Sequence, residues 1–386
     1  MTQQHETPAL PRMLHIKWTK GPNLPQGIQD SSGGILDNTL ITAGGFCQGA
    51  ELWSGHMHCA GKEHKYPRGF LNKTWGLNLS TMTTWQSLPP LPCEGRQGGC
   101  FTVVGDQLYT WAGFSYTEPY AYRDGYRLSR DSAGEWAWDK LPDLPHPFCA
   151  PSCVSIDSKI YLFGGADYDL EGFFTHTDRY GKHPNYGARL FVLDTQDLES
   201  GWKALRPCEH GTPRWIPGAA AVDGKLYVMG GGTGSDNPTG AYCTVVDNWR
   251  YDPGTDTWDR LADLPISSGN FPPGPIVYKN RYMILVGGYQ YEHVMNPDGT
   301  IREPYGKPFQ HYTDRAYCSD VFAYDTATGE FGTADPLPLN NNMPLAIVDR
   351  DRIFLIGGET AGAVVEGECY GLHPDLCLIG QISKAG

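Results

Sequence analysis

The stretch Ser158-Lys159-Ile160-Tyr161-Leu162-Phe163-Gly164-Gly165 runs from a polar turn through an alternating apolar segment into two glycines. Alternation over this length is typical of a half-buried β-strand, and the glycines mark its end. This order occurs six times, with a mean spacing of about 63 residues between Gly45 and Gly358. The other five copies are Asn38–Gly45, Asp106–Gly113, Gly224–Gly231, Asn280–Gly288 and Asp351–Gly358. Such repetition predicts a repeat architecture rather than a set of unrelated domains.

A second pattern, an aromatic residue followed by a Leu-Pro-rich turn, alternates with the first. Its clear copies are Trp85–Pro92, Trp138–Pro145 and Trp258–Pro265, and Trp202 and Phe331 open weaker ones. Between the two patterns lies a further strand that ends in a polar turn, as in the segment Trp249–Trp258. Each repeat therefore supplies about four strands, which is the unit of a propeller blade.

The two ends of the chain complement each other. After Gly358 there is one more strand-like stretch near Gly367–Leu372 but no further aromatic-Leu-Pro unit, and the missing unit is His15–Pro25. We therefore predict an all-β, six-bladed β-propeller in which the N-terminal strand closes the last blade and removes an open sheet edge. The predicted blades span residues 26–92, 93–146, 147–208, 209–266, 267–339 and, for the last blade, 340–386 together with 13–25.

We expect the double glycines to allow close packing near the axis, where a side chain would not fit. We expect the tryptophans to fill the space between adjacent blades. Both sets of residues are thus interpreted as structural.

Composition and charge narrow the range of partners. The 386 residues include 48 Gly and 30 Pro, but 40% are hydrophobic and 12% aromatic, so a packed core is expected. The net charge of −13 argues against nucleic acid or an anionic membrane surface as the main partner. No apolar run is long enough to span a membrane. The segment Met1–Pro8 lacks the basic and apolar regions of a signal peptide, so a cytoplasmic location is expected.

Sequence motifs for metal or cofactor binding are weak. His56, His58, Cys59 and His64 lie close together and include plausible zinc or iron ligands. On an extended strand, however, the two histidines of an H-x-H segment share one face and Cys59 points away from it. We interpret them as surface residues and predict no metal and no cofactor. The sequence also contains no P-loop, no Ser-His-Asp signature and no GxGxxG between a strand and a helix.

The segments that join consecutive blades meet around the axis on one face of a propeller, where loops carry function on a rigid scaffold. The candidate binding residues in these segments are Asp30, Glu94, Arg96, Arg214, Trp215, Asn270 and Asn342. Insertions after the glycine pairs add aromatic residues such as Tyr289 to the same face. This mixture suits the recognition of a sugar or sugar acid, with the arginines holding a carboxylate. The alternative for Arg96 and Arg214 is that each has a structural role between blades.

The six glycine copies and their phased aromatics resemble the kelch family of β-propellers across nearly the whole chain. Within that family, the segments Leu355–Gly362 and Tyr317–Val321 are similar to those of the N-acetylneuraminate epimerases, or sialic acid mutarotases. This resemblance implies a six-bladed isomerase that acts on a sugar acid by proton transfer to the ring oxygen and from the anomeric hydroxyl. It implies Glu359 and Arg214 as catalytic residues, with Arg96 and Asn342 in support.

The alternative function is a propeller without enzymatic activity that binds another protein or a ligand. A deep polar pocket at the axis would favour a small molecule, and a shallow surface ringed by exposed apolar residues would favour a protein partner. The sequence does not decide between the two and does not identify a sugar.

Overall fold

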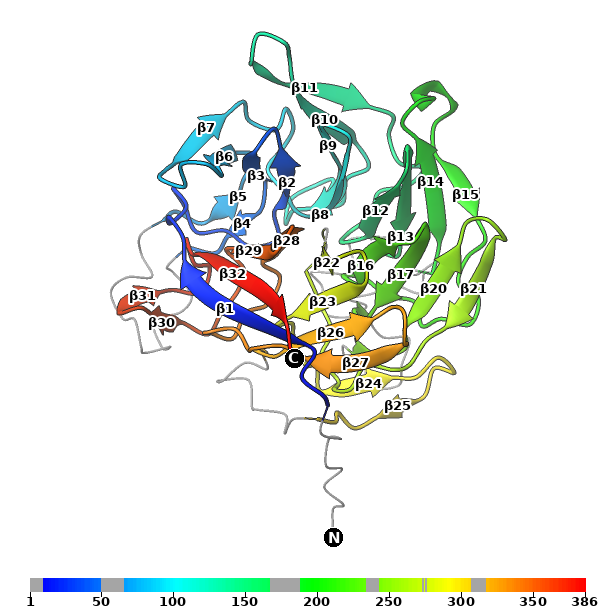
Figure 1. Cartoon of the computed structure of the whole chain (residues 1–386). Coiled ribbons are helices and arrows are strands. Elements are labelled where there is room, and N and C mark those ends of the chain that lie inside the picture. The colour runs from blue at the N-terminus through cyan, green and yellow to red at the C-terminus, as the bar shows by residue number, and fades with distance from the viewer. Residues whose placement is uncertain are drawn as a thin grey trace.

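The computed structural model describes residues 10–49, 66–166, 188–233, 243–272, 274, 276–306 and 317–386. Within this part of the chain, six four-stranded antiparallel sheets are arranged around a central axis (Figure 1). The prediction of an all-β, six-bladed propeller is therefore confirmed. Among the described residues, no helix has the length and apolar character needed to cross a bilayer.

Each blade is one sheet whose first strand lies nearest the axis. The first three blades contain β2 (Ser32–Leu36), β3 (Thr39–Ala43), β6 (Thr74–Asn78) and β7 (Trp85–Leu88); β8 (Gln97–Val104), β9 (Gln107–Phe114), β10 (Gly125–Arg130) and β11 (Trp136–Leu141); and β12 (Ser152–Ile156), β13 (Lys159–Phe163), β14 (Leu190–Asp194) and β15 (Lys203–Leu205). The next two contain β16 (Gly218–Val222), β17 (Lys225–Met229), β20 (Trp249–Asp252) and β21 (Thr257–Arg260); and β22 (Val277–Tyr278), β23 (Tyr282–Val286), β26 (Val321–Asp325) and β27 (Glu330–Thr333).

The last blade joins the two ends of the chain. It consists of β28 (Leu345–Asp349), β29 (Arg352–Ile356), β32 (Cys377–Lys384) and the N-terminal β1 (Leu14–Lys20). β1 and β32 pair antiparallel with Ile16 opposite Ile382, and the blue and red ends of the chain lie side by side in Figure 1. The N-terminal strand thus closes the ring as predicted.

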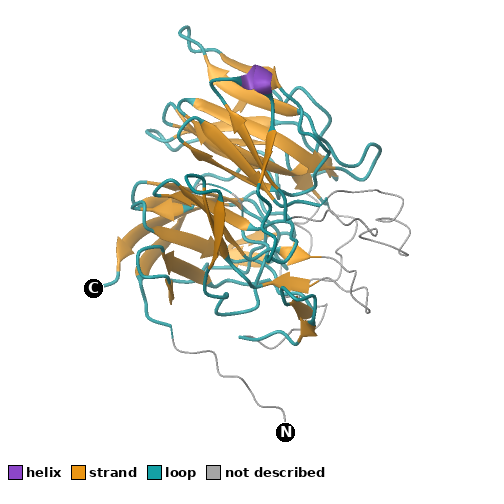
Figure 2. Ribbon diagram, turned by 90° about the vertical axis from the view of Figure 1, so that its right-hand side faces the viewer, coloured by secondary structure: helices purple, strands orange, loops and turns teal. Residues whose placement is uncertain are grey.

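Short sheets formed by the insertions extend the blades at one end. They are β4 (Phe46–Cys47) with β5 (Gly69–Phe70), β30 (Ala363–Val365) with β31 (Glu368–Tyr370), and the four strands β18 (Gly232–Thr233), β19 (Cys243–Val245), β24 (His293–Met295) and β25 (Ile301–Arg302). β19 and β24 pair in parallel, which ties the insertion of the fourth blade to that of the fifth. Loops and strands make up nearly all of the described chain, and a 3-10 helix, η2 (Leu198–Ser200), lies on the outside of the third blade (Figure 2).

At five of the six glycine pairs, the second glycine joins its blade to the next one. The N–H groups of Gly45, Gly113, Gly165, Gly288 and Gly358 donate to carbonyl oxygens of the following blade at 2.8–3.1 Å. Each of these glycines has a positive φ, between 86° and 103°. A Cβ at Gly45 or Gly288 would lie 2.7 or 2.4 Å from the backbone oxygen of Gln29 or Gly269. A side chain therefore cannot be accommodated at this corner, which explains the repeated glycine physically.

The blade-connecting segments form a closed ring around the axis. One residue of each segment has a left-handed backbone with φ between 49° and 63°, and we call these six residues the axial ring: Asp30, Gly98, Ala150, Ile216, Asn270 and Met343. Four hydrogen bonds connect consecutive members of this ring, and in each of them a backbone N–H donates to the carbonyl of the previous member. The donor–acceptor pairs are Asp30–Met343 (3.2 Å), Gly98–Asp30 (3.2 Å), Ala150–Gly98 (2.9 Å) and Ile216–Ala150 (2.8 Å). The ring fixes where the side chains of different blades meet.

The tryptophans of the outer strands lie between blades, as expected. The indole N–H groups of Trp85, Trp138 and Trp258 donate to carbonyl oxygens in the turns of the preceding blades at 2.9–3.0 Å. Trp18 makes the same bond to Asp335 at 3.3 Å and so extends the pattern to the closing strand.

Substitution of the second glycine should destabilise the protein far more than substitution of a turn glycine. We expect Gly288→Ala to lower the free energy of unfolding by about 3 kcal/mol, because the new Cβ meets a backbone oxygen. Gly224 also has a positive φ (69°), but a Cβ at this position would have no atom within 4 Å, so Gly224→Ala should cost only about 1 kcal/mol. Urea unfolding followed by fluorescence measures both values, and equal losses would contradict the clash.

Closure of the ring should depend on the buried face of β1. Ile16 is 2% exposed, whereas its neighbour Lys17 points to solvent. We expect Ile16→Ala to lower the free energy of unfolding by about 2–4 kcal/mol through lost apolar burial and a cavity. Lys17→Ala on the same strand is the control and should change it by less than about 0.5 kcal/mol. Calorimetry of the two variants tests this, and a silent Ile16→Ala would show that β1 does not hold the last blade.

Candidate functional site

A second ring of residues surrounds the axis next to the axial ring. Because the first strand of each blade begins and the second strand ends at the same end of the propeller, a residue before the first strand pairs with the residue after the glycine pair. We call these residues the mouth ring, and the six pairs are Gln29–Phe46, Gln97–Phe114, Cys149–Ala166, Trp215–Gly232, Gly269–Tyr289 and Asn342–Glu359. The repeat thus brings residues from the whole length of the chain to one small area.

The two sides of this area differ in polarity. Phe114, Cys149, Ala166 and Trp215, from the second to fourth blades, form one apolar cluster with members of the axial ring. On the other side, the first, fifth and sixth blades contribute carboxyl and amide groups. An apolar wall opposite a polar one suits a ligand that has an apolar face and a hydroxyl-bearing edge.

Two carboxyl groups lie on the polar side. Asp30 is 8% exposed, and its Oδ2 has no hydrogen-bond partner among the described residues. Burial, together with the negative charge of Glu359, raises the pKa of Asp30 to about 7. Glu359 accepts a hydrogen bond from Asn342 Nδ2 at 3.3 Å. The pair therefore combines a carboxyl group whose pKa is raised toward neutral pH with a second carboxyl group beside it.

Amide oxygens without partners surround this pair. Gln29 Oε1, Asn270 Oδ1 and Asn342 Oδ1 are buried and accept no hydrogen bond within the described part of the chain. Two of the amide nitrogens are in use elsewhere, since Gln29 donates to Gln97 and Asn270 donates to Tyr291, both at 2.8 Å. A buried acceptor without a donor costs about 1–3 kcal/mol, which the hydroxyl groups of a ligand can offset.

An aromatic cluster lies where the first and second blades meet. It consists of Phe46, Phe70, Phe114 and Tyr116, with ring centroids of neighbouring members 4.6–6.3 Å apart. Burial raises the pKa of the Tyr116 phenol; a hydrogen bond with Gln97 lowers it, the charge of Glu359 raises it and that of Arg68 lowers it. Tyr116 is thus near enough to both Glu359 and Arg68 for their charges to act on its phenol.

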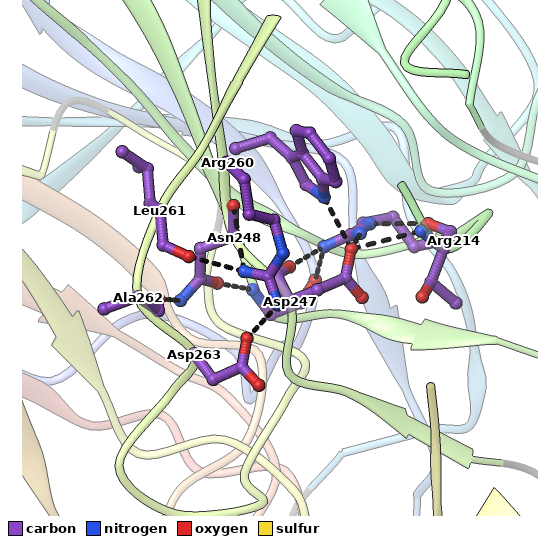
Figure 3. A network of polar contacts seen from close by, with 10 residues as sticks. Arg214, Asp247, Asn248, Arg260, Leu261, Ala262 and Asp263 are labelled. Carbon is purple, nitrogen blue, oxygen red and sulfur yellow. Dashed lines mark hydrogen bonds and ion pairs between the residues drawn. The ribbon is translucent and has the colours of Figure 1, made fainter. Parts of the chain in front are cut away.

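Arg214, by contrast, is part of the interior (Figure 3). Its side chain is 0% exposed and donates to Asp247 Oδ2 at 2.5 Å, and its guanidinium also donates to the carbonyls of Thr212, Gly230 and Asp247. Burial pushes the pKa of Asp247 up, but the charge of Arg214 and hydrogen bonds from Thr212 and Trp249 outweigh it and leave that pKa lowered. These contacts are those of the structural alternative for Arg214.

Arg96 repeats this arrangement in the second blade. Its guanidinium donates to Asp124 at 2.5 and 3.2 Å and to the carbonyls of Glu94 and Ala112, and it lies 3.7 Å from the centroid of the Tyr122 ring. The Glu94 side chain is exposed. Both arginines therefore fasten a connecting segment to their own blade.

The site residues predicted from the sequence fall into those in or beside the two rings and those outside them. The structure brings together five of them in or beside the two rings with Glu359: Asp30, Trp215, Asn270, Tyr289 and Asn342. It places Arg96, Arg214 and Glu94 outside these rings. Four further residues at the site were not among the candidates: Gln29, Gln97, Tyr116 and Tyr291. The recurring position before each inner strand was a signal that pointed to Gln29 and Gln97.

A cavity of about 230 Å³ lies farther along the axis, among the inner strands. Its described lining residues include Phe101, Ser155, Ala221, Val277 and Val348, and no Asp, Glu, Lys, Arg or His is among them. The two carboxyl groups described above belong to the two rings and do not line this cavity.

The candidate metal ligands cannot be placed at either location. His56, His58, Cys59 and His64 lie outside the described residues. Among the residues that are described, no group of three His, Cys, Asp or Glu side chains could hold a metal ion.

Comparisons with known proteins agree with this architecture. The Kelch motif matches residues 217–265, the strands of the fourth blade. The N-acetylneuraminate epimerases of Pasteurella multocida (strain Pm70) and Haemophilus influenzae (strain 86-028NP) are 24% and 23% identical over 376 residues, 88% of each chain. The kelch-like protein terF of Aspergillus terreus is 24% identical over 281 residues, 72% of this chain and 53% of that protein.

The solved structure of YjhT has the same fold. It superposes with a TM-score of 0.63 at 14% identity and covers 95% of this chain and 99% of that chain. Together with the repeated glycine corners and the closing N-terminal strand, the matches identify the architecture. The chain is a kelch-motif β-propeller protein, distantly similar in sequence to N-acetylneuraminate epimerases over most of its length.

Proposed function

We propose that the protein interconverts the two anomers of a sugar acid at the mouth ring. The observation that carries this proposal is the pair Asp30 and Glu359, in which the pKa of Asp30 is raised to about 7. A group that titrates near neutral pH exchanges protons with little penalty in either direction. The distant similarity to N-acetylneuraminate epimerases supports a carbohydrate ligand.

Mutarotation needs one acid and one base. Asp30 donates its proton to the ring oxygen while Glu359 accepts the proton of the anomeric hydroxyl, so that the bond between the anomeric carbon and the ring oxygen breaks and a carbonyl forms. After rotation, the hydroxyl that was the ring oxygen attacks the other face of the carbonyl and returns its proton to Asp30. Glu359 gives its proton back to the carbonyl oxygen, and both residues return to their initial state.

Asp30 takes the second catalytic role in this proposal, in place of Arg214. Arg214 has its guanidinium bonded to Asp247 and three carbonyl groups and is fully buried, whereas Asp30 has an unpartnered oxygen among the described residues. Asn342 positions Glu359 through the bond from its Nδ2. The unpartnered amide oxygens of Gln29 and Asn270 accept sugar hydroxyls.

The charge and polarity of the site also bear on the alternative, a protein-binding propeller. Within the described residues, Val364 is the large hydrophobic side chain that is exposed, at 53%, and it lies on the β30–β31 hairpin. A ring of exposed apolar residues, which a protein interface would favour, is thus not found there. The polar, acceptor-rich mouth ring supports a small hydroxylated ligand instead.

Amide replacements of the two carboxyl groups should slow anomer exchange. We expect Glu359→Gln and Asp30→Asn each to reduce the catalysed rate by about 10²–10⁴-fold, because each removes one partner in proton transfer. Glu330→Gln, at an exposed position on β27, is the matched control and should leave the rate unchanged. Saturation-transfer NMR with N-acetylneuraminate measures exchange directly. Wild-type rates in both site variants would refute the acid–base pair.

The raised pKa of Asp30 also predicts how stability depends on pH. Between its ordinary value of 3.8 and about 7, the folded protein holds a proton that the unfolded chain has lost, so the contribution of this group to stability falls as pH rises through that window. Asp30→Asn removes the dependence. Relative to wild type, we expect this variant to gain up to about 4 kcal/mol between pH 4 and pH 8.

Urea unfolding at the two pH values measures this difference. Glu330→Gln should show no comparable gain, since Glu330 is exposed. A constant difference between Asp30→Asn and wild type across the range would mean that Asp30 is charged in the folded protein at neutral pH.

A further inference from the structure

The described part of the mouth has a surplus of negative charge. Asp30 and Glu359 belong to the two rings at the axis, and the guanidinium groups of Arg96 and Arg214 are bonded to Asp124 and Asp247. A sugar acid adds a further carboxylate. Its binding therefore requires a cation that is not already paired.

Arg68 is a cation of this kind. It immediately precedes β5, is exposed, and makes no side-chain hydrogen bond or ion pair within the described ranges. Its guanidinium carbon lies 5.9 Å from the centroid of the Phe46 ring, a cation–π contact with a member of the aromatic cluster. An unpaired guanidinium presents its planar set of donors to a ligand.

The position of Arg68 relates it to the carboxyl pair. Phe46 is a member of the mouth ring and pairs with Gln29, which is adjacent in sequence to Asp30. Tyr116, packed against Phe46 at 5.6 Å, experiences the charges of both Arg68 and Glu359. Tyr116 and Phe46 therefore connect the region of the Arg68 guanidinium with that of Glu359.

We propose that Arg68 is the specificity-determining residue that binds the carboxylate of the sugar acid. This inference rests on the proposed function, because it assigns the ligand's carboxylate to Arg68 and its anomeric carbon to Asp30 and Glu359. A guanidinium matches a carboxylate with two parallel hydrogen bonds, which a neutral sugar cannot form. Arg68 is a positioning residue and takes no part in proton transfer.

Binding of N-acetylneuraminate and of its methyl ester, measured by calorimetry, tests the assignment. Arg68→Gln should weaken binding of the acid by about 10–100-fold and leave that of the uncharged ester nearly unchanged. Arg350→Gln is the matched control, since Arg350 is exposed, makes no ion pair among the described residues and lies in the turn between β28 and β29, away from the mouth. It removes the same charge and should alter neither affinity.

Two further measurements separate specificity from structure. Arg68→Lys should recover part of the affinity for the acid, and increased ionic strength should weaken acid binding more in wild type than in Arg68→Gln. In the exchange assay, Arg68→Gln should raise KM for the acid and leave kcat within a few-fold.

The outcomes distinguish this inference from the proposed function. An unchanged preference for acid over ester in Arg68→Gln would overturn the role of Arg68, even if anomer exchange is catalysed. Acid binding that depends on Arg68 without any exchange would support Arg68 and refute the mutarotase. Equal binding of acid and ester by the wild type would overturn the assignment directly.

Discussion

The tight backbone packing at the glycine corner, where the second glycine lies against the connecting segment of its own blade and bonds to that of the next, is the constraint on which the other features depend. The N–H of Gly45 donates to the carbonyl of Arg96 in the next blade at 2.8 Å, while a Cβ at Gly45 would lie 2.7 Å from the carbonyl oxygen of Gln29 in its own blade. Repeated around the axis, this contact sets the width of the ring, and each connecting segment passes through a left-handed residue. A rigid ring of that size holds Asp30 and Glu359 near each other, so the backbone geometry determines the electrostatics of the site.

The regular geometry of the connecting segments also separates their charged residues into buried arginines within the blades and carboxyl groups at the axis. Residues two positions before the axial ring are buried in each blade, and Arg96 and Arg214 occupy this position in the second and fourth blades. Both guanidinium groups donate to three equivalent acceptors. These are the carbonyl two residues earlier (Glu94 or Thr212), the carbonyl at the first position of the glycine pair (Ala112 or Gly230) and an aspartate before the third strand (Asp124 or Asp247). These hydrogen bonds fix the connecting segments to their blades. The polar groups of the mouth ring and the axial ring are therefore mainly hydrogen-bond acceptors.

The blade repeat could be predicted from the sequence because its signals are local: the double glycine, the alternating strand and the aromatic-Leu-Pro turn each report a backbone requirement. Position in the repeat also pointed to Asp30 and Asn342 as candidates, whereas Glu359 was a candidate because of the family resemblance of Leu355–Gly362. The direction of a side chain is not a local property. Arg214 and Trp215 are neighbours in sequence, yet one points into the blade and the other joins the mouth ring, since alternate residues of an extended segment face opposite sides. The position of Tyr116 at the site could not be predicted either, because it depends on how the insertion of the second blade folds.

The carboxyl pair thus belongs to the backbone rings at the axis, and the candidate cation belongs to an insertion. The raised pKa of Asp30 comes mainly from burial, in a ring whose corners at five of the six glycine pairs are bonded to the next blade. The proton transfer that we propose would therefore depend on the geometry of the repeat itself. The guanidinium that we propose to select an anion lies instead beside β5, in the insertion that follows the first glycine pair and outside the two rings. In this proposal, a change of sequence in that insertion would alter which ligand binds without altering the carboxyl pair.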